Sequence, residues 1–314
     1  MIWDSFKKPF FVLAPMNEVT DSVFRQVIDS CARPDVYFTE FISVDILAST
    51  DKELMSNKLY FTNIEKPLIV QLWGIHPENF LLETKILVEK GFAGVDLNMG
   101  CPVAKIIKNG ACSSLINDRK LAKEIIDATK NGAGDTPLSI KTRIGYDNID
   151  LSWIEFLLQQ NIDCITVHAR TVIEKSNVPN HFEVLPEILD MRSRISPNTK
   201  IILNGDVTSR QHGCDLANKY AVDGIMVGRA IFDDPYFFSR QSNWNAYTPE
   251  QKISLYLKHV ELFDQTWENS KNPDVLKKYA QIYISDFEHA QEVRNAVMRE
   301  VNISGMKKII QSFI

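Results

Sequence analysis

The chain has 314 residues, which is enough for one large domain and a small one. Its composition, 45% apolar and 24% charged, is ordinary for a globular protein, and no apolar run reaches the roughly 18 residues that a membrane helix needs. The net charge of −5 does not indicate a nucleic-acid-binding protein, although such binding needs only a local basic face.

Eight short apolar or alternating segments are predicted as strands, and helical patterns lie between most of them. The strands are expected at 10–15, 36–42, 68–72, 94–98, 138–142, 164–167, 201–203 and 224–227. The helices are expected at 21–32, 77–91, 121–130 (closed by Gly132), 151–160, 182–194 and 209–220, with a less regular region after 42. This alternation predicts an α/β fold, a (β/α)8 TIM barrel. A doubly wound sheet would need an early Gly-x-Gly-x-x-Gly, which the sequence lacks.

The pattern changes near Arg240. Residues 241–251 are polar and aromatic and contain the break at Pro249, and beyond them helical periodicity continues to Ile314 without strand alternation. We therefore expect two domains, a barrel at 1–240 and a small helical domain at 241–314.

The cysteines and the N-terminus bear on the cell compartment. The sequence has five cysteines, an odd number, which are widely spaced and include no Cys-x-x-Cys pair. This argues against a disulfide framework and against a zinc site. Residues 1–11 lack the pattern of a secretory signal. A cytoplasmic protein without a metal site is expected.

The predicted strands end in polar or special residues, and in a TIM barrel all of these ends face one mouth. One such residue would mean little, whereas eight converging ends indicate a functional site. In chain order the residues are Ala14, Pro15, Met16, Glu40, Gln71, Asn98, Cys101, Lys141, Arg143, His168, Arg170, Asn204, Gly205, Asp206, Gly228 and Arg229.

Cys101 is the candidate catalytic residue. It follows an alternating strand that breaks at Gly100 and Pro102, so it is placed on the loop just beyond a strand end. A cysteine taken alone is more often structural, but this position favours chemistry.

The strand ends also favour a flat, phosphorylated cofactor. Gly205 and Gly228 follow strands seven and eight, the usual phosphate site of a TIM barrel, and Arg229 adds a fork for phosphate. Gln71 offers a donor and an acceptor to an imide edge, and Lys141 offers positive charge to a ring that becomes anionic on reduction. A reduced flavin meets these requirements, although either glycine alone is more often a simple turn.

Taken together, these segments resemble the tRNA-dihydrouridine synthases. The matching blocks span the barrel in the family's order and spacing, and the block from Asn98 to Pro102 is specific to the family. The other blocks are 12–16, 19–21, 39–40, 71–74, 96–97, 141–143, 167–171, 204–206 and 228–230, with a looser match around Lys277, Lys278 and Arg294.

The resemblance implies an FMN-dependent oxidoreductase that reduces the C5=C6 bond of specific D-loop uridines in tRNA to 5,6-dihydrouridine, with NADPH as reductant. Hydride would pass from FMN N5 to uridine C6 and a proton from Cys101 to C5, after the base is swung into the barrel mouth. The domain at 1–240 would hold FMN and the domain at 241–314 would bind tRNA, and a monomer is expected.

The resemblance also assigns residues to the two ligands. The implied cofactor contacts are Ala14, Pro15, Met16, Gln71, Lys141, His168, Asn204, Gly205, Asp206, Gly228 and Arg229. The implied uridine or tRNA contacts are Glu40, Asn98, Lys105, Lys108, Arg143, Arg170 and Lys278. Segment 101–145 carries eight basic and four acidic residues, and this local charge of +4 suits contact with tRNA phosphate.

Four positions depart from the family's usual pattern. Cys112 stands where the family usually has glycine, and the loop after Arg170 lacks the usual Gly-Tyr. Phe182 replaces a tryptophan, and Lys278-Tyr279 replaces a Lys-His pair. These departures bear on the tRNA contacts rather than on the chemistry.

Two alternative functions are open to the same residues. A flavin barrel of the dihydroorotate dehydrogenase type would act on a free pyrimidine, but it would need neither the helical tail nor the +4 segment. A non-catalytic tRNA-binding protein would not need Cys101, Lys141 and the paired glycines.

Overall fold

The computed structural model describes residues 2–268 and 270–314, and its contacts divide the chain into two compact units. The first unit comprises Met1–Thr20 and Pro34–Gly228, and the second comprises Asp21–Arg33 and Arg229–Ile314. The sequence analysis expected the helical domain to begin at 241. In the structure, the second unit also includes residues 229–240 and the helix that follows the first strand.

Eight parallel strands form the first unit, in the sheet order β1-β8-β7-β6-β5-β4-β3-β2. Beyond the sheet, Val12 forms a parallel bridge with Val36, and the Leu13 N–H donates to the Val36 carbonyl at 3.2 Å, so the ends of the sheet meet. The predicted (β/α)8 barrel is confirmed. The strands are β1 (Phe10–Leu13), β2 (Tyr37–Ser43), β3 (Leu68–Trp73), β4 (Gly94–Met99), β5 (Leu138–Arg143), β6 (Cys164–His168), β7 (Lys200–Asn204) and β8 (Gly224–Val227).

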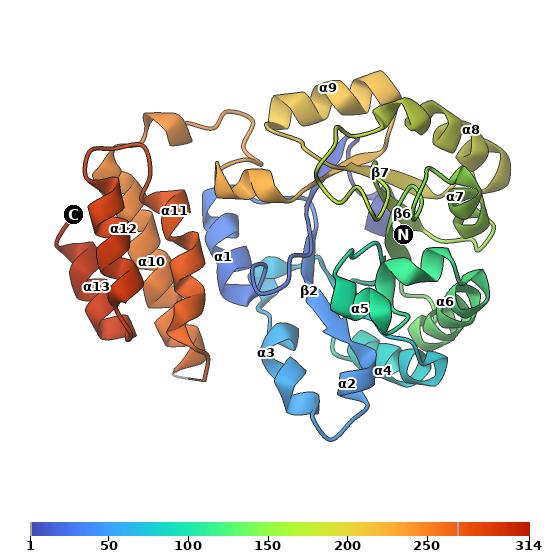
Figure 1. Cartoon of the computed structure of the whole chain (residues 1–314), viewed down its shortest axis with the longest axis horizontal. Coiled ribbons are helices and arrows are strands. Elements are labelled where there is room, and N and C mark those ends of the chain that lie inside the picture. The colour runs from blue at the N-terminus through green and yellow to red at the C-terminus, as the bar shows by residue number, and fades with distance from the viewer. Residues whose placement is uncertain (1, 269) are drawn as a thin grey trace. The chain divides into compact units, whose positions relative to one another are not determined.

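Helices follow the strands around this barrel (Figure 1). They are α2 (Val44–Leu47), α3 (Ser56–Leu59), α4 (Pro77–Glu89), α5 (Ala104–Lys108), α6 (Arg119–Ala133), α7 (Leu151–Leu158), α8 (Leu185–Ile195) and α9 (Arg210–Tyr220), with 3-10 turns η1 (Ile2–Asp4), η2 (Lys52–Met55), η3 (Asn63–Glu65), η4 (Cys112–Ile116) and η5 (Phe182–Val184). Across residues 2–268 and 270–314, no helix combines the length and the apolarity that crossing a membrane requires.

The helix at α6 corrects one sequence prediction. Gly132 does not close this helix, which continues to Ala133 and ends at Gly134 with a positive φ of 57°. A Cβ at Gly132 would lie 2.5 Å from the Leu81 carbonyl oxygen of α4. The glycine is therefore needed for the close approach of α4 and α6. The less regular region after 42 also contains short helices, α2 and α3.

The second unit is helical. It contains α1 (Ser22–Cys31), α10 (Pro249–Trp267), α11 (Ala280–Tyr283), α12 (Ala290–Arg299) and α13 (Ile303–Gln311), with 3-10 turns η6 (Arg229–Phe232), η7 (Trp244–Ala246) and η8 (Pro273–Tyr279). The Asp21 carboxylate caps α1 by accepting from the Phe24 N–H at 2.9 Å, at the start of the helix that the sequence predicts over 21–32. The Phe24 ring stacks on Tyr279 of η8 with centroids 5.1 Å apart. This contact explains why α1 belongs to the helical unit.

Candidate active site

A cavity of about 170 Å³ lies at the carboxyl ends of the barrel strands. Strands β2 to β6 and the segment after β1 all contribute to it, so six predicted ligand contacts and the predicted catalytic cysteine meet there. Phe41 also lines it, a residue that the sequence did not single out. The lining residues are Pro15, Phe41, Gln71, Asn98, Gly100, Cys101, Pro102, Lys141, Arg143 and His168.

The loop after β4 is held by the side chain at the end of that strand. The Asn98 amide oxygen accepts from the N–H of Gly100 at 3.2 Å and from the N–H of Cys101 at 3.0 Å. A Cβ at Gly100 would lie 3.2 Å from the Thr142 backbone, so a glycine lets this loop cross close to β5. The break in the sequence pattern therefore marks a loop that presents Cys101 to the cavity.

A buried polar network supports Asn98. Its amide nitrogen donates to the Gln71 oxygen at 3.0 Å, and the Gln71 nitrogen donates to Asp96 at 2.7 Å. The Ser139 hydroxyl donates to the other Asp96 oxygen at 2.6 Å. Each of these bonds lies in the interior, where polar groups must be paired, so the network fixes the rotamers of Gln71 and Asn98.

Asp96, like Phe41, is a residue of the site that sequence reasoning missed. Burial raises the pKa of its carboxyl group to about 6, against the hydrogen bonds from Ser139 and Gln71 that favour the charged form. The available signal was an acidic residue inside an otherwise apolar strand, where charge is costly unless it is hydrogen-bonded. Its effect on the cavity is to orient Gln71.

Two cationic side chains of β5 reach the cavity. Burial lowers the pKa of Lys141 to about 8, and the like charge of Arg143 adds to this effect. Arg143 is buried and donates to three backbone carbonyls, those of Gly100 (2.9 Å), Thr171 (2.8 Å) and Lys175 (3.0 Å). The Arg143 side chain therefore joins the loop of Cys101 to the loop that follows β6.

The thiol of Cys101 is more acidic than an ordinary cysteine. A hydrogen bond with the Cys112 thiol lowers the pKa of Cys101 to about 7, against the opposing effect of burial. The Val103 N–H and the charges of Lys141 and Arg143 act in the same direction as Cys112. An ordinary thiol, with a pKa of about 8.5, is almost wholly protonated at neutral pH. The Cys101 thiol, with a pKa of about 7, is protonated in roughly half of the molecules at that pH.

The Arg170 side chain also binds groups of this chain. It is buried, donates to the Val178 carbonyl at 2.6 Å, pairs with Asp206 and lies 3.4 Å from the His168 Nε2. The Asn180 amide donates to the same Asp206 carboxylate at 3.0 Å. Arg170 and Asp206, which were predicted as ligand contacts, therefore hold the loop after β6 over its strand.

The predicted phosphate site follows β7 and β8. Gly205 has a φ of 131°, which disfavours any side chain, and the Asn180 side chain fills the place of a Cβ there. A Cβ at Gly228 would lie 3.8 Å from the Ala14 Cβ and 4.0 Å from the Met16 sulfur, so the backbone there is open. The Asn204 amide donates to the Met226 carbonyl at 3.0 Å. Of the two glycines, Gly228 therefore has the open backbone, beside Ala14 and Met16, whereas the space at Gly205 is filled by Asn180.

Three further predicted residues of the first unit lie outside the cavity lining. Glu40 is buried, accepts a hydrogen bond from the Glu18 N–H and lies 3.5 Å from the Lys58 amine. Lys105 and Lys108 are exposed on α5, directly after the Cys101 loop. Their exposure leaves both amines open to an external anion.

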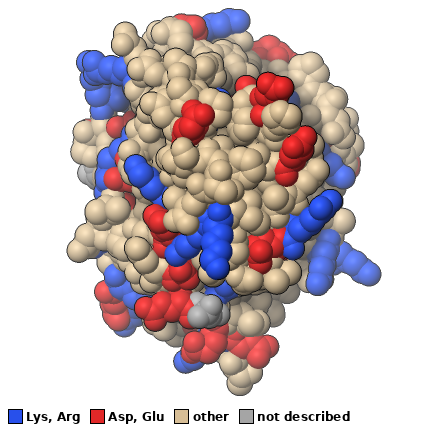
Figure 2. Space-filling model, turned by 90° about the vertical axis from the view of Figure 1, so that its left-hand side faces the viewer, with Lys and Arg blue, Asp and Glu red and all other residues tan. Residues whose placement is uncertain are grey.

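Arg229 and Lys278 belong to the second unit, at η6 and in η8. Lys278 lines a cavity of about 430 Å³ together with Lys277 and Arg294, so three cations gather on this unit. Figure 2 shows basic and acidic side chains interspersed on the face that it draws.

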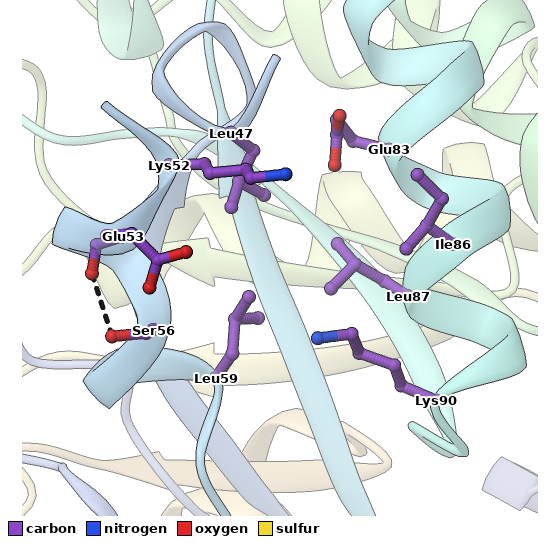
Figure 3. A pocket seen from close by; sticks show the side chains of 9 residues that line it. All are labelled: Leu47, Lys52, Glu53, Ser56, Leu59, Glu83, Ile86, Leu87 and Lys90. Atoms are coloured by element: carbon purple, nitrogen blue, oxygen red, sulfur yellow. Dashed lines mark hydrogen bonds between the residues drawn. The ribbon is translucent and has the colours of Figure 1, made fainter. Parts of the chain in front are cut away.

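The first unit has another cavity, of about 310 Å³, between α2, η2 and α3 on one side and α4 on the other. Figure 3 shows the amines of Lys52 and Lys90 directed into it from opposite sides, over the apolar side chains of Leu59 and Leu87. It contains none of the predicted site residues. In the described residues, no group of three or more His, Cys, Asp or Glu side chains could hold a metal ion.

The comparisons with solved structures indicate the fold. A variant of NCR from Zymomonas mobilis matches with a TM-score of 0.50 at 13% identity, over 72% of this chain and 83% of the other. A 2-naphthoyl-CoA reductase complex matches with a TM-score of 0.57 at 10% identity, over 76% of this chain and 50% of the other. At these identities the likeness concerns the architecture alone.

The comparisons with sequences are more specific. The family model described as dihydrouridine synthase matches residues 12–312. A protein named probable tRNA-dihydrouridine synthase 2 from Bacillus subtilis (strain 168) is 38% identical over 99% of this chain and 96% of its own length. A probable tRNA-dihydrouridine synthase from Staphylococcus aureus (strain COL) is 38% identical over 99% of this chain and 95% of its own. The chain belongs to the dihydrouridine synthase family.

Proposed function

We propose that this protein is an FMN-dependent oxidoreductase that reduces uridine in tRNA to 5,6-dihydrouridine, with NADPH as the reductant and D-loop uridines as the target. The observation that carries the proposal is the placement of Cys101. It stands at a polar cavity in the barrel mouth, held by Asn98 and flanked by Lys141 and Arg143. The family membership supports the same reaction.

The residues around the cavity fit an FMN. The open backbone at Gly228, beside Ala14 and Met16, suits a phosphate, because bare amides can approach an anion closely. Lys141 and Arg143 place two cations at the cavity, which suits a ring that gains negative charge. Gln71, His168 and Pro15 would line the ring. When bound, FMN supplies the hydride that reduces C6 of the uridine.

Cys101 then supplies the proton that C5 needs. Negative charge develops toward C5 and O4 when C6 is reduced, and a general acid works best when its pKa lies near the operating pH. The pKa of about 7 meets that requirement. The thiol gives its proton to C5 and becomes a thiolate, which Lys141 and Arg143 stabilise by their positive charge.

The tRNA would be held by basic residues outside the cavity. Lys105 and Lys108 on α5 follow the catalytic loop and are exposed, so they are suited to phosphate oxygens. Lys277, Lys278 and Arg294 offer a second cationic cluster on the helical unit. A free pyrimidine would need neither cluster, and therefore the dihydroorotate dehydrogenase alternative is not favoured.

The direct test is the dihydrouridine content of each tRNA, mapped by mass spectrometry in cells with and without this protein. We expect dihydrouridine to disappear at specific D-loop positions when the protein is absent and to return when it is restored. Restoration with a Cys101→Ala copy should not bring it back. Unchanged dihydrouridine in a strain that lacks every other family member would contradict the proposal.

The tRNA affinity is expected to fall steeply as salt concentration rises, because each phosphate contact releases counterions. Replacing both Lys105 and Lys108 with alanine should make the slope of log K against log salt shallower by about 2, one for each lost contact. Filter binding of a tRNA transcript between low and high salt measures both slopes. A flat response of the unaltered protein would contradict the role of tRNA as substrate.

A further inference from the structure

Three polar side chains lie in one row across neighbouring strands of the barrel. The strand register places Gln71 of β3 beside Asp96 of β4, and Asp96 beside Ser139 of β5, and all three residues are buried. Asn98 lies two residues further along β4, on the same face of that strand as Asp96 and nearer to its carboxyl end. Charge in the interior is costly unless it is hydrogen-bonded, and apolar side chains would pack in this row without that cost.

Hydrogen bonds run from this row to the loop of Cys101 in a single direction. The Asp96 carboxyl group, with a pKa of about 6, is mostly ionised at neutral pH, and a carboxylate only accepts. The Gln71 amide therefore turns its nitrogen to Asp96 (2.7 Å) and its oxygen to the Asn98 nitrogen (3.0 Å). The Asn98 oxygen then faces the N–H groups of Gly100 (3.2 Å) and Cys101 (3.0 Å), which only donate. We call Asp96, Gln71 and Asn98 the amide relay.

The orientation of the Asn98 amide decides whether the loop is held. A primary amide can turn over about its last side-chain bond and exchange the places of its oxygen and its nitrogen. With its nitrogen toward the loop, Asn98 would set donors against the N–H groups of Gly100 and Cys101, and both would lose their acceptor. The Gln71 oxygen opposes this turn because it accepts from the Asn98 nitrogen, and it faces Asn98 because Asp96 takes the Gln71 nitrogen.

We propose that Asp96 is a positioning residue for the reaction, which holds the backbone of Cys101 in place through two side-chain amides. Its carboxylate orients the Gln71 amide, and the Gln71 amide orients that of Asn98. Asp96 is not among the residues that line the cavity, so it acts through the amide relay rather than on a ligand. The inference rests on the proposed function, in which Cys101 supplies the proton.

Amide hydrogen exchange measures how firmly the loop is held, without any substrate. The full chain is studied free of tRNA, and exchange at Gly100 and Cys101 is followed by mass spectrometry of the peptide that contains both. The Asp96→Ala variant removes the acceptor at the start of the amide relay, and Gln71→Met removes its middle amide. Two matched controls leave the relay intact. The Asp96→Asn variant can still turn an oxygen to Gln71 and its nitrogen to the Ser139 hydroxyl, and Ser139→Ala removes only the other partner of the carboxylate.

We expect exchange at Gly100 and Cys101 to be about 10-fold faster in Asp96→Ala and in Gln71→Met, the usual effect of losing interior hydrogen bonds. The double variant should exchange no faster than the faster single variant, because both changes break the same relay. Both control variants should match the unaltered protein. Unchanged exchange in Asp96→Ala, an equal increase in Ser139→Ala, or a double variant whose increase is the product of the two single increases would overturn the proposal.

Two measures guard against a general loss of stability. Exchange in β6, which contributes no residue to the amide relay, is the reference, because global destabilisation would raise it as well. If Asp96→Ala does not fold, Gln71→Met still tests the relay with the carboxylate in place, and unchanged exchange there overturns the proposal.

Turnover supplies the second readout. The Asp96→Ala variant should form dihydrouridine about 10- to 100-fold more slowly in a single turnover, because the thiol is misplaced. Its tRNA affinity should be unchanged, since the basic residues outside the cavity are untouched. Faster exchange at the loop with an unchanged rate would overturn the positioning role.

Failure of this proposal and failure of the proposed function are distinguishable. If the protein does not reduce tRNA uridine, the exchange rates still report whether Asp96 holds the loop of Cys101. If Asp96 has no such effect, exchange in the variants matches that of the unaltered protein while dihydrouridine is still formed.

Discussion

Replacing Cys101 with alanine is expected to lower the rate of dihydrouridine formation by about 10²–10⁴-fold, the usual contribution of a positioned general acid. FMN and tRNA should still bind, because the cavity keeps its other lining residues and the basic clusters are untouched. Single-turnover reduction of a tRNA transcript, with dihydrouridine counted by mass spectrometry, measures the loss. The flavin absorbance of the purified variant and its tRNA affinity verify the binding.

A matched control is available in Cys214→Ala, which removes a half-buried thiol of α9 that does not line the cavity. Its rate should equal that of the unaltered protein. Normal turnover by Cys101→Ala would remove the assignment of Cys101 as the acid. Loss of the bound flavin in that variant would instead indicate a structural role for the cysteine.

The acid role also has a pH signature. Cys101 must be protonated to react, so the single-turnover rate should be constant at low pH and fall as pH rises through about 7. The Cys101→Ala variant should show no such fall in its residual rate.

The barrel could be predicted from the sequence because its strands are buried on both faces. Such strands show as short apolar or alternating segments separated by turn residues, and all eight were placed within a few residues. The helix boundary at Gly132 was wrong for a physical reason. A glycine ends a helix when it adopts a positive φ, and Gly134 does so, whereas Gly132 serves the contact with α4.

The loop that presents Cys101 could be predicted because Gly100 and Pro102 break a strand locally. The partners of its side chains could not, because they come from distant segments. Asp96 and Ser139 meet only through the register of β4 and β5, and the Ser113 hydroxyl donates to the Cys101 carbonyl from twelve residues further along the chain. No short window of sequence contains these relations.

For Arg143 and Arg170, the sequence indicated the position of the side chain but not its partners. Their place at the strand ends indicated ligand contacts, as did the resemblance, yet a side chain at a strand end can bind the protein's own loops instead. Arg143 and Arg170 together bind four carbonyls of the chain, of which three belong to the loop after β6. Their guanidinium groups organise the mouth rather than reach outward.

Replacing Arg143 with alanine is therefore expected to lower the free energy of unfolding by about 3 kcal/mol, because two buried carbonyls and one part-buried carbonyl lose their donor. This corresponds to a fall in Tm of about 5–10 °C for a unit of this size. The loop that contains Thr171 and Lys175 should also become sensitive to limited proteolysis, since it loses two of its anchors. Thermal unfolding and proteolysis of the purified protein measure these effects.

Two further variants decide between this anchoring role and a contact with tRNA phosphate. The Arg143→Lys variant keeps the positive charge but lacks the planar fork that reaches several carbonyls, so this variant should be nearly as unstable as Arg143→Ala.

The control is Arg194→Ala, which removes an exposed arginine of α8 that is paired with Asp190. This change should alter the free energy of unfolding by about 0.5 kcal/mol or less. If Arg143→Ala instead kept its Tm and made the salt dependence of tRNA binding shallower, Arg143 would be a phosphate ligand. An unchanged salt slope with a lowered Tm is the outcome that the three carbonyl contacts predict.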